Sequence, residues 1–474
     1  MTAQKWTVRL FGFFTIALLT RVLTPADFGV VAAAGTVLPF FYLLADLGFA
    51  AYIVQVQKTD QRMLSTGFWF SSVAGLALWL VLVAVAPLLG LIFQDAQVTP
   101  VLQVLAICVV LYGLSSVPMA LLRRGMRFQT IAWQGAAAAL VAQVAAVVMA
   151  LAGTGVWALV VQAVVAPSVV MVLSWITVHW RPGFAFSRTD FTAMARYGSQ
   201  VLGVELVAMT RAWAEAALVA SALGMTGLGF LNIAQRLVQV VQDLTGAALV
   251  PVTTVSFARI RENAERLRQA YFRALRMTYF VMTPPLTLLA VAGPLIIPVV
   301  FGDGWDASQR TTQILALAGI LTVGAALDHG LFYGLGRPGR WFVYAVIVDA
   351  GTVGMTAVTV PHGLEAMSFG FLAVALAATA VRWFLVAKLL DTGPWVVAGP
   401  FWFLAAAVVT SGAAGLAAVA LTQPLLPIIR ILIVGLTVLV VYLAVARLMA
   451  RSVLAEITGY LARFREKHLV RRSN

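Results

Sequence analysis

Charge is scarce in this sequence. Only 11% of the 474 residues are Asp, Glu, Lys or Arg, whereas 62% are hydrophobic. A water-soluble chain does not need such an excess of apolar side chains, and apolar runs of about 18 or more residues indicate membrane-spanning helices. The composition therefore excludes an ordinary soluble protein and predicts a membrane protein.

The usual ligands of metals and nucleotides are also rare. The chain has one cysteine, Cys108, so it cannot form an internal disulfide, and its four histidines show no metal-binding spacing. No G-x-x-x-x-G-K-[ST] phosphate loop is present, which excludes an ATP-driven motor within this sequence. We therefore expect no metal, no cofactor and no enzymatic activity.

Apolar windows divide the chain into fourteen candidate spans. Each is long enough for a helix to cross a hydrocarbon core of about 30 Å at about 1.5 Å per residue. The spans are 6–24, 28–54, 66–93, 101–122, 130–152, 155–178, 197–223, 227–256, 278–301, 311–333, 341–360, 364–387, 395–421 and 426–446.

The basic residues test this count, because cytoplasmic loops of membrane proteins are enriched in Lys and Arg. If the N-terminus is cytoplasmic, 24 of the 32 basic residues lie in inner loops or the C-terminal tail. Six of the outer loops together contain a single basic residue, Arg310. The pattern predicts fourteen spans with both termini in the cytoplasm. The net charge of +14 is thereby explained without nucleic acid, since no basic cluster has interleaved aromatics.

The chain also resembles itself at an offset of about two hundred residues. "LLTRVLTPADFGVV" (18–31) aligns with "LVASALGMTGLGFL" (218–231), and this alignment pairs Gly29 with Gly229. "APLLGLIF" resembles "GPLIIPVVF", and "LLRRGMRF" resembles "LGRPGRW", in the same order along each half.

The repeat predicts the domain organisation. Six spans per repeat give both halves the same orientation, so we expect two six-helix bundles related by a parallel pseudo-twofold axis, an architecture of transporters. The predicted domains are 1–180 and 181–390 for the two bundles, 391–448 for helices 13 and 14, and 449–474 for a basic cytoplasmic tail.

Several segments resemble a known family. "LTRVLTPADFGVV…ADLGFAAYIVQ", "LGFLNIAQRLVQVVQDLTGAALVPV…FARI", "FGDGW" and "GLGRPGR" are similar to the signature of the Wzx-like polysaccharide flippases of the MOP exporter superfamily, over roughly residues 15–390. The first span begins only a few residues after Met1, whereas relatives have a longer lead, so a start further upstream is an alternative.

This resemblance implies a fold and a function. The fold is an all-α polytopic membrane protein with fourteen transmembrane helices. The function is transport of polyprenyl-pyrophosphate-linked oligosaccharide from the inner to the outer leaflet of the bacterial inner membrane, for lipopolysaccharide or another surface polysaccharide. The implied partners are the lipid-linked oligosaccharide, membrane lipids, and a polysaccharide polymerase with its chain-length machinery.

Charged residues inside the spans are the candidate site, because a charge at the bilayer centre costs roughly 2.5–3.5 kcal/mol unless it faces a wet interior. In the eighth span, polar residues recur at spacings of four, three and four, which places them on one helical face. Arginine binds a pyrophosphate with paired hydrogen bonds. The candidate headgroup residues are Arg9, Arg211, Arg236, Asn232 and Gln239. The alternative for each arginine is an internal ion pair with a carboxylate.

Carboxylates in a transport cleft are also candidates for coupling to protons or sodium. They are Asp46, Glu215, Asp243 and Asp328, and the alternative for each is a structural pairing.

Other functions remain open on the sequence alone. A cation-coupled multidrug exporter or a peptidoglycan lipid precursor flippase would share the superfamily. A membrane glycan polymerase or ligase is the alternative from another class, although its large catalytic outer loop is missing from the predicted loops.

Overall fold

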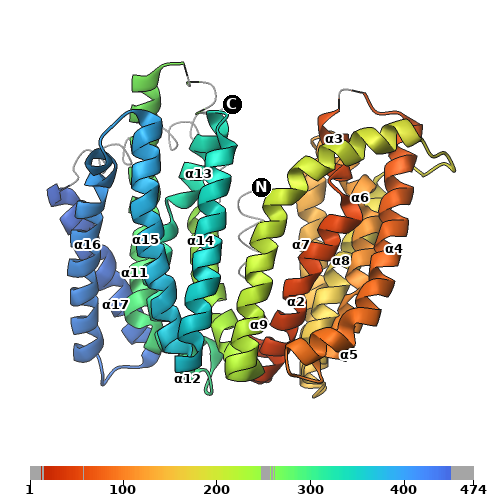
Figure 1. Ribbon diagram of the computed structural model, residues 1–474. Helices are drawn as coiled ribbons and strands as arrows, with labels where there is room; N and C mark the ends of the chain where they lie inside the picture. The colour runs from red at the N-terminus through yellow and green to blue at the C-terminus, as the bar shows by residue number, and fades with distance from the viewer. Residues whose placement is uncertain are drawn as a thin grey trace, which may run out of the picture. The chain divides into compact units, whose positions relative to one another are not determined.

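In the computed structural model the described part of the chain is helical and contains no β-strand (Figure 1). The described residues are 12, 15–56, 58–246, 257, 260 and 262–449, with the side chains of 197–205, 208, 243–246 and 400 excluded. The predicted all-α fold is confirmed.

The chain divides into two compact units. Unit 1 comprises Met1–Asn232, Phe301–Gly304 and Thr356–Gly363; unit 2 comprises Ile233–Val300, Trp305–Met355 and Leu364–Asn474. The four domains expected from the sequence, and the pseudo-twofold axis between the first two, stay predictions.

Unit 1 is a bundle in which α7 packs along α8 and α4 packs along α6. Its helices are α2 (Pro25–Asp46), α3 (Phe49–Gln55), α4 (Gln61–Ile92), α5 (Val98–Leu105), α6 (Ile107–Arg124), α7 (Phe128–Leu151) and α8 (Trp157–Thr177). The long helix α9 (Arg188–Gly246) begins in unit 1 and continues into unit 2.

Unit 2 is a second bundle, in which α12 packs against α15 and α16 packs against α17. Its helices are α11 (Ala264–Phe301), α12 (Asp306–Thr322), α13 (Ala325–Gly334), α14 (Pro338–Thr359), α15 (Leu364–Leu390), α16 (Pro394–Leu421) and α17 (Pro427–Met449). The end of α14 and the short 3-10 turn that follows it, η1 (Val360–His362), belong to unit 1.

Within the described residues, twelve helices are long and apolar enough to cross a bilayer. The predicted seventh and eighth spans form one helical run, α9, which is interrupted at Gly224 with φ 70° and ψ −178°. The first predicted span lies mostly outside the described residues. The count of fourteen therefore stays a prediction.

Local sequence explains where α2 begins and ends. Thr24 and Asp27 form a capping box, in which each side chain binds the backbone N–H of the other residue, and Pro25 occupies the first helical position. The helix ends because Leu47 and Gly48 adopt positive φ angles of 46° and 73°. The chain then resumes as α3, so the second predicted span is a broken helix.

Two glycines allow α2 to cross the second segment of α9 at very short range within unit 1. A Cβ atom on Gly29 would lie 1.8 Å from the carbonyl oxygen of Met225, and one on Gly229 would lie 1.9 Å from that of Pro25. No side chain fits at such distances, so the crossing requires glycine on both helices. These are the two glycines that the internal repeat pairs.

We predict that Gly29→Ala destabilises the protein by about 1–3 kcal/mol, because the added methyl group forces the two helices apart. Thermal unfolding in detergent measures the change. Gly35→Ala is the matched control on the same helix, since a Cβ there meets nothing within 4 Å. Equal unfolding temperatures for the two variants would contradict the crossing.

Candidate functional site

The second segment of α9, which follows Gly224, has one polar and one apolar face. Gln235, Arg236 and Gln239 are exposed, and Asn232 is partly exposed. The opposite face is buried and consists of Ile233, Ala234, Leu237 and Val238. We call the exposed residues the α9 polar stripe. An arginine side chain within a span is costly if it faces lipid. The α9 polar stripe is therefore suited to facing a water-filled path or to binding an anionic ligand.

Arg211, another predicted headgroup residue, is engaged by its own helix. Its Nη1 lies 2.9 Å from the Oε2 of Glu215, one turn further along the first segment of α9. Glu215 is buried with 6% exposure, whereas the side chain of Arg211 is about one-third exposed. The pair matches the alternative that the sequence left open, an internal bond between arginine and carboxylate.

Asp46 lies at the break between α2 and α3. Both of its carboxylate oxygens accept the backbone N–H of Ala50 at 3.3 Å, so the side chain caps the first turn of α3. The hydroxyl of Ser116 on α6 donates a short hydrogen bond to the same carboxylate. Asp46 is buried, and it forms no ion pair with any described residue.

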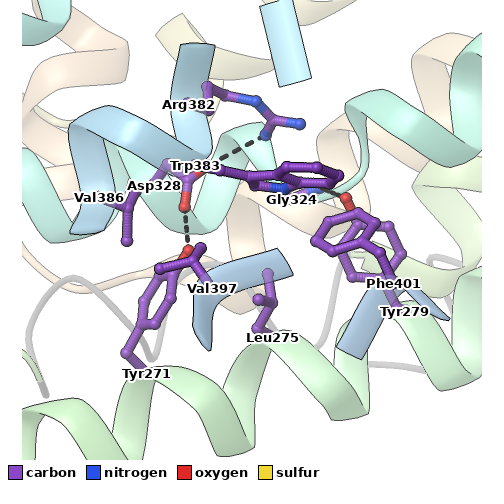
Figure 2. A pocket seen from close by; sticks show the side chains of 10 residues that line it. All are labelled: Tyr271, Leu275, Tyr279, Gly324, Asp328, Arg382, Trp383, Val386, Val397 and Phe401. Carbon is purple, nitrogen blue, oxygen red and sulfur yellow. Dashed lines mark hydrogen bonds and ion pairs between the residues drawn. The ribbon is translucent and has the colours of Figure 1, made fainter. Parts of the chain in front are cut away.

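Asp328, on α13 in unit 2, is the centre of a buried ionic cluster (Figure 2). Its Oδ2 lies 3.1 Å from Nη1 of Arg382 on α15, and its Oδ1 accepts a 2.5 Å hydrogen bond from the hydroxyl of Tyr271 on α11. All three residues are at most 3% exposed. The cluster therefore joins three helices of the same unit.

Arg382 is satisfied by further partners. Its Nη2 donates to the carbonyl oxygen of Leu321 at 2.7 Å and to the hydroxyl of Thr379 at 3.1 Å. The same carbonyl accepts the hydroxyl of Tyr279 at 3.2 Å. Leu321 lies near the end of α12, where the helix gives way to α13, so the cluster supplies donors for backbone that α12 leaves unpaired.

The cavity beside this cluster is too small for a substrate. It measures about 10 Å³ and is walled by aromatic side chains that include Trp383 and Phe401 (Figure 2). A volume of this size accommodates about one water molecule. The arrangement can hold α11, α13 and α15 together, but it cannot accommodate a sugar or a phosphate.

Two predicted residues cannot be placed. Arg9 lies outside the described residues, and for Asp243 only the backbone, within α9, is described. Among the described residues no group of three or more His, Cys, Asp and Glu side chains could hold a metal ion.

Sequence reasoning missed the partners of the buried carboxylates. Ser116 and Tyr271 are ordinary helical residues, and they lie 70 and 57 positions from the aspartates that they bind. The sequence does contain a signal for one partner. Asp328 and Arg382 are both charged residues within apolar spans, and a carboxylate in such a place requires a nearby cation. No spacing connects the two, because they meet only through helix packing.

We predict that Arg382→Gln destabilises the protein by about 3–5 kcal/mol, because it leaves the carboxylate of Asp328 buried without a cation. Thermal unfolding and the yield of monodisperse protein measure the loss. Asp328→Asn combined with Arg382→Gln is expected to cost less than the sum of the single changes. Arg310→Gln is the control, since its contact with Glu365 at 3.9 Å is exposed and weak. Additive single changes would contradict the pairing.

Comparison of the sequence with known proteins finds relatives that act in polysaccharide biosynthesis. The chain is 26% identical to the succinoglycan biosynthesis transport protein ExoT of Rhizobium meliloti, over 81% of this chain and 78% of the relative. It is 21% identical to the lipopolysaccharide biosynthesis protein WzxC of Escherichia coli, over 80% and 77%. It is 23% identical to the teichuronic acid biosynthesis protein TuaB of Bacillus subtilis, over 68% of each chain.

Solved structures share the fold. A structure of the lipid II flippase MurJ matches with a TM-score of 0.78 at 14% identity, over 95% of this chain and 99% of that one. An inward-facing multidrug resistance MATE transporter of the MOP superfamily matches with a TM-score of 0.65 at 15% identity, over 82% and 98%. At these identities the likeness establishes the fold of a multi-span membrane protein.

The family itself is established by a model of the polysaccharide biosynthesis proteins, which matches residues 18–310. That match covers more than half of the chain and includes α2 to α9, with both the Asp46 cap and the α9 polar stripe. The chain belongs to the polysaccharide biosynthesis protein family.

Proposed function

We propose that this protein is a flippase that moves a polyprenyl-pyrophosphate-linked oligosaccharide from the inner to the outer leaflet for cell-surface polysaccharide biosynthesis. The family supports a glycan substrate, and the fold supports translocation across a bilayer. The names of the relatives refer to three different polysaccharides, so the sugar itself is left open.

The observation that carries the proposal is an arginine within a membrane span, Arg236, whose side chain reaches the surface of its helix. A pyrophosphate brings negative charge into the membrane, and arginine offers it paired, planar hydrogen bonds. The amides of Gln239 and Asn232 on the same face add neutral donors and acceptors that suit sugar hydroxyls. Arg211 is the weaker candidate, because Glu215 already holds its guanidinium.

We expect Arg236→Ala to reduce flipping about tenfold or more, because the net loss of a charged hydrogen bond is about 1.5–3 kcal/mol. The assay uses proteoliposomes that contain a fluorescent polyprenyl-pyrophosphate oligosaccharide in one leaflet. Arg236→Lys is expected to be intermediate, since a single ammonium replaces a bidentate group. Arg340→Ala, which removes an exposed arginine at the start of α14, is the control. Equal rates for all four proteins would contradict a role for Arg236.

We also propose that Asp46 is the residue through which transport is coupled to an ion. Protonation of Asp328 or Glu215 would break an ion pair with an arginine. Protonation of Asp46 breaks no ion pair, and it changes the hydrogen bonds that join α2, α3 and α6. A proton or a sodium ion at this carboxylate would thus change the contacts at the break between α2 and α3. The backbone can move more easily there, because helix ends have few internal hydrogen bonds.

We predict that Asp46→Asn abolishes the response of flipping to a proton or sodium gradient, while exchange without a gradient continues. Initial rates are compared with and without each gradient in the same vesicles. Asp303→Asn, an exposed carboxylate in the turn after α11, is the control and is expected to retain the response. A full gradient response in Asp46→Asn would remove this residue from the coupling mechanism.

The alternatives differ in the charge of the substrate. A multidrug exporter would carry cations, and an exposed arginine such as Arg236 repels them. A peptidoglycan lipid precursor is another polyprenyl-pyrophosphate glycan, so only the choice of sugar in the flipping assay separates it. Catalysis by a polymerase or ligase would require grouped acid, base or nucleophilic side chains at the outer surface, and the described residues hold no cluster of three or more His, Cys, Asp and Glu side chains that could bind a metal ion.

The proposed location is the bacterial inner membrane, with both termini in the cytoplasm, as the positive-inside rule predicts. Polymerase and chain-length proteins are the proposed downstream partners, because a flipped oligosaccharide is a substrate for polymerisation.

A further inference from the structure

The segment that joins α8 to α9, residues 178–187, is irregular but firmly held. We call it the connecting segment; it is yellow in Figure 1. Its backbone polar groups are bound by side chains from the first turns of α4. Gln61 donates to the carbonyl of Arg181 at 2.6 Å, and the hydroxyl of Ser65 accepts the N–H of Gly183 at 2.9 Å.

Two further bonds complete this attachment. The indole N–H of Trp69 donates to the carbonyl of Gly183 at 2.9 Å, and the hydroxyl of Thr66 accepts the N–H of Ser187 at 2.8 Å. The side chain of Arg181 also contacts the start of the segment, because its Nη1 donates to the carbonyl of Val178 at 2.8 Å. Water would satisfy such groups in an ordinary surface loop, whereas lipid would leave them unpaired. The attachment therefore suits a place where water is scarce.

The outward side of the connecting segment is aromatic. Phe184 is 97% exposed, and Phe186 is 55% exposed. The ring of Phe184 stacks against Trp69, with 5.5 Å between ring centroids, so the phenyl ring is held on the outer surface of α4. Exposed Phe side chains beside a Trp suit the apolar side of a segment that lies at the interface between lipid and water.

The length and the first turn of α4 indicate the depth of the connecting segment relative to the bilayer. The 32 residues of this helix are more than the roughly 20 that a bilayer core requires, and its first turn carries the exposed polar residues Gln61 and Arg62, so this end of α4 suits the headgroup region. Exposed basic residues lie near the same end of the unit, namely Lys58, Arg62 and Arg188, together with the carboxylates Asp60 and Asp190. Asp60 is occupied as the cap of α4, where it accepts the N–H of Met63.

We propose that the connecting segment is an anchor at the membrane interface: Phe184 and Phe186 insert among the lipids of the cytoplasmic leaflet, and Arg62 and Arg188 contact the phosphates of anionic lipids. The partner surface is thus an anionic phospholipid leaflet. The anchor fixes one end of unit 1 at a defined depth, at the point where the chain passes from α8 to α9.

Spin labels can measure this depth, because the single native cysteine, Cys108, is buried. Phe184→Cys carries the nitroxide in proteoliposomes, and power saturation compares its access to oxygen and to a water-soluble nickel chelate. Leu80→Cys, exposed on the middle of α4, is the lipid reference, and Asp303→Cys is the water reference. We expect the label at residue 184 to favour oxygen over nickel and to lie at or just below the phosphates. Nickel access equal to that at residue 303 would overturn the proposal.

The charge of the leaflet gives a second test. Labelled protein is reconstituted in phosphatidylcholine alone and in phosphatidylcholine with phosphatidylglycerol. We expect a deeper label in the anionic vesicles, and we expect Arg62→Gln with Arg188→Gln to remove that difference. An equal depth in both vesicles would overturn the contact with anionic phosphates. The unfolding temperature of each labelled protein shows whether the variant has folded, and Phe186→Cys is the substitute if Phe184→Cys has not.

Discussion

Lipid offers no hydrogen bonds, so every backbone polar group that enters the bilayer must find its partner within the protein. The break between α2 and α3 shows how this is done. Asp46 accepts the N–H of Ala50 at the start of α3, and Arg124 donates to the carbonyls of Ile53 and Val56 at its end. Both ends of a seven-residue helix are thus closed by side chains from the protein itself.

The same constraint separates the charged residues into two kinds. Asp328 and Arg382 are buried together, and each is satisfied by the other and by neighbouring hydroxyl and carbonyl groups. Such a cluster holds helices in register, but it offers nothing to a ligand. Arg236 lies on the exposed face of a helix whose opposite face is packed, and no carboxylate of the described residues forms an ion pair with it. We therefore propose the exposed stripe as the functional surface, and the buried cluster as a structural element.

Close helix packing supplies the other requirement of a transporter, which is a defined scaffold around a polar path. Gly29 and Gly229 bring α2 and α9 together at backbone contact, which side chains of any size would prevent. The interruption of α9 at Gly224 lies only a few residues from this crossing. Glycine thus sets both where the helical run is interrupted and where it meets α2.

The sequence by itself determined the all-helical fold, the approximate extent of most helical segments and the polar face of α9, but not the break between α2 and α3. Apolar runs, the capping box at Thr24 and the helical spacing of Arg236 and Gln239 are local properties, and hydrophobicity and backbone geometry act locally on them. Only the tertiary structure decided that Asp328 meets Arg382 and that Asp46 meets Ser116. These partners are 54 and 70 residues apart, and no local pattern specifies which faces of two distant helices pack together.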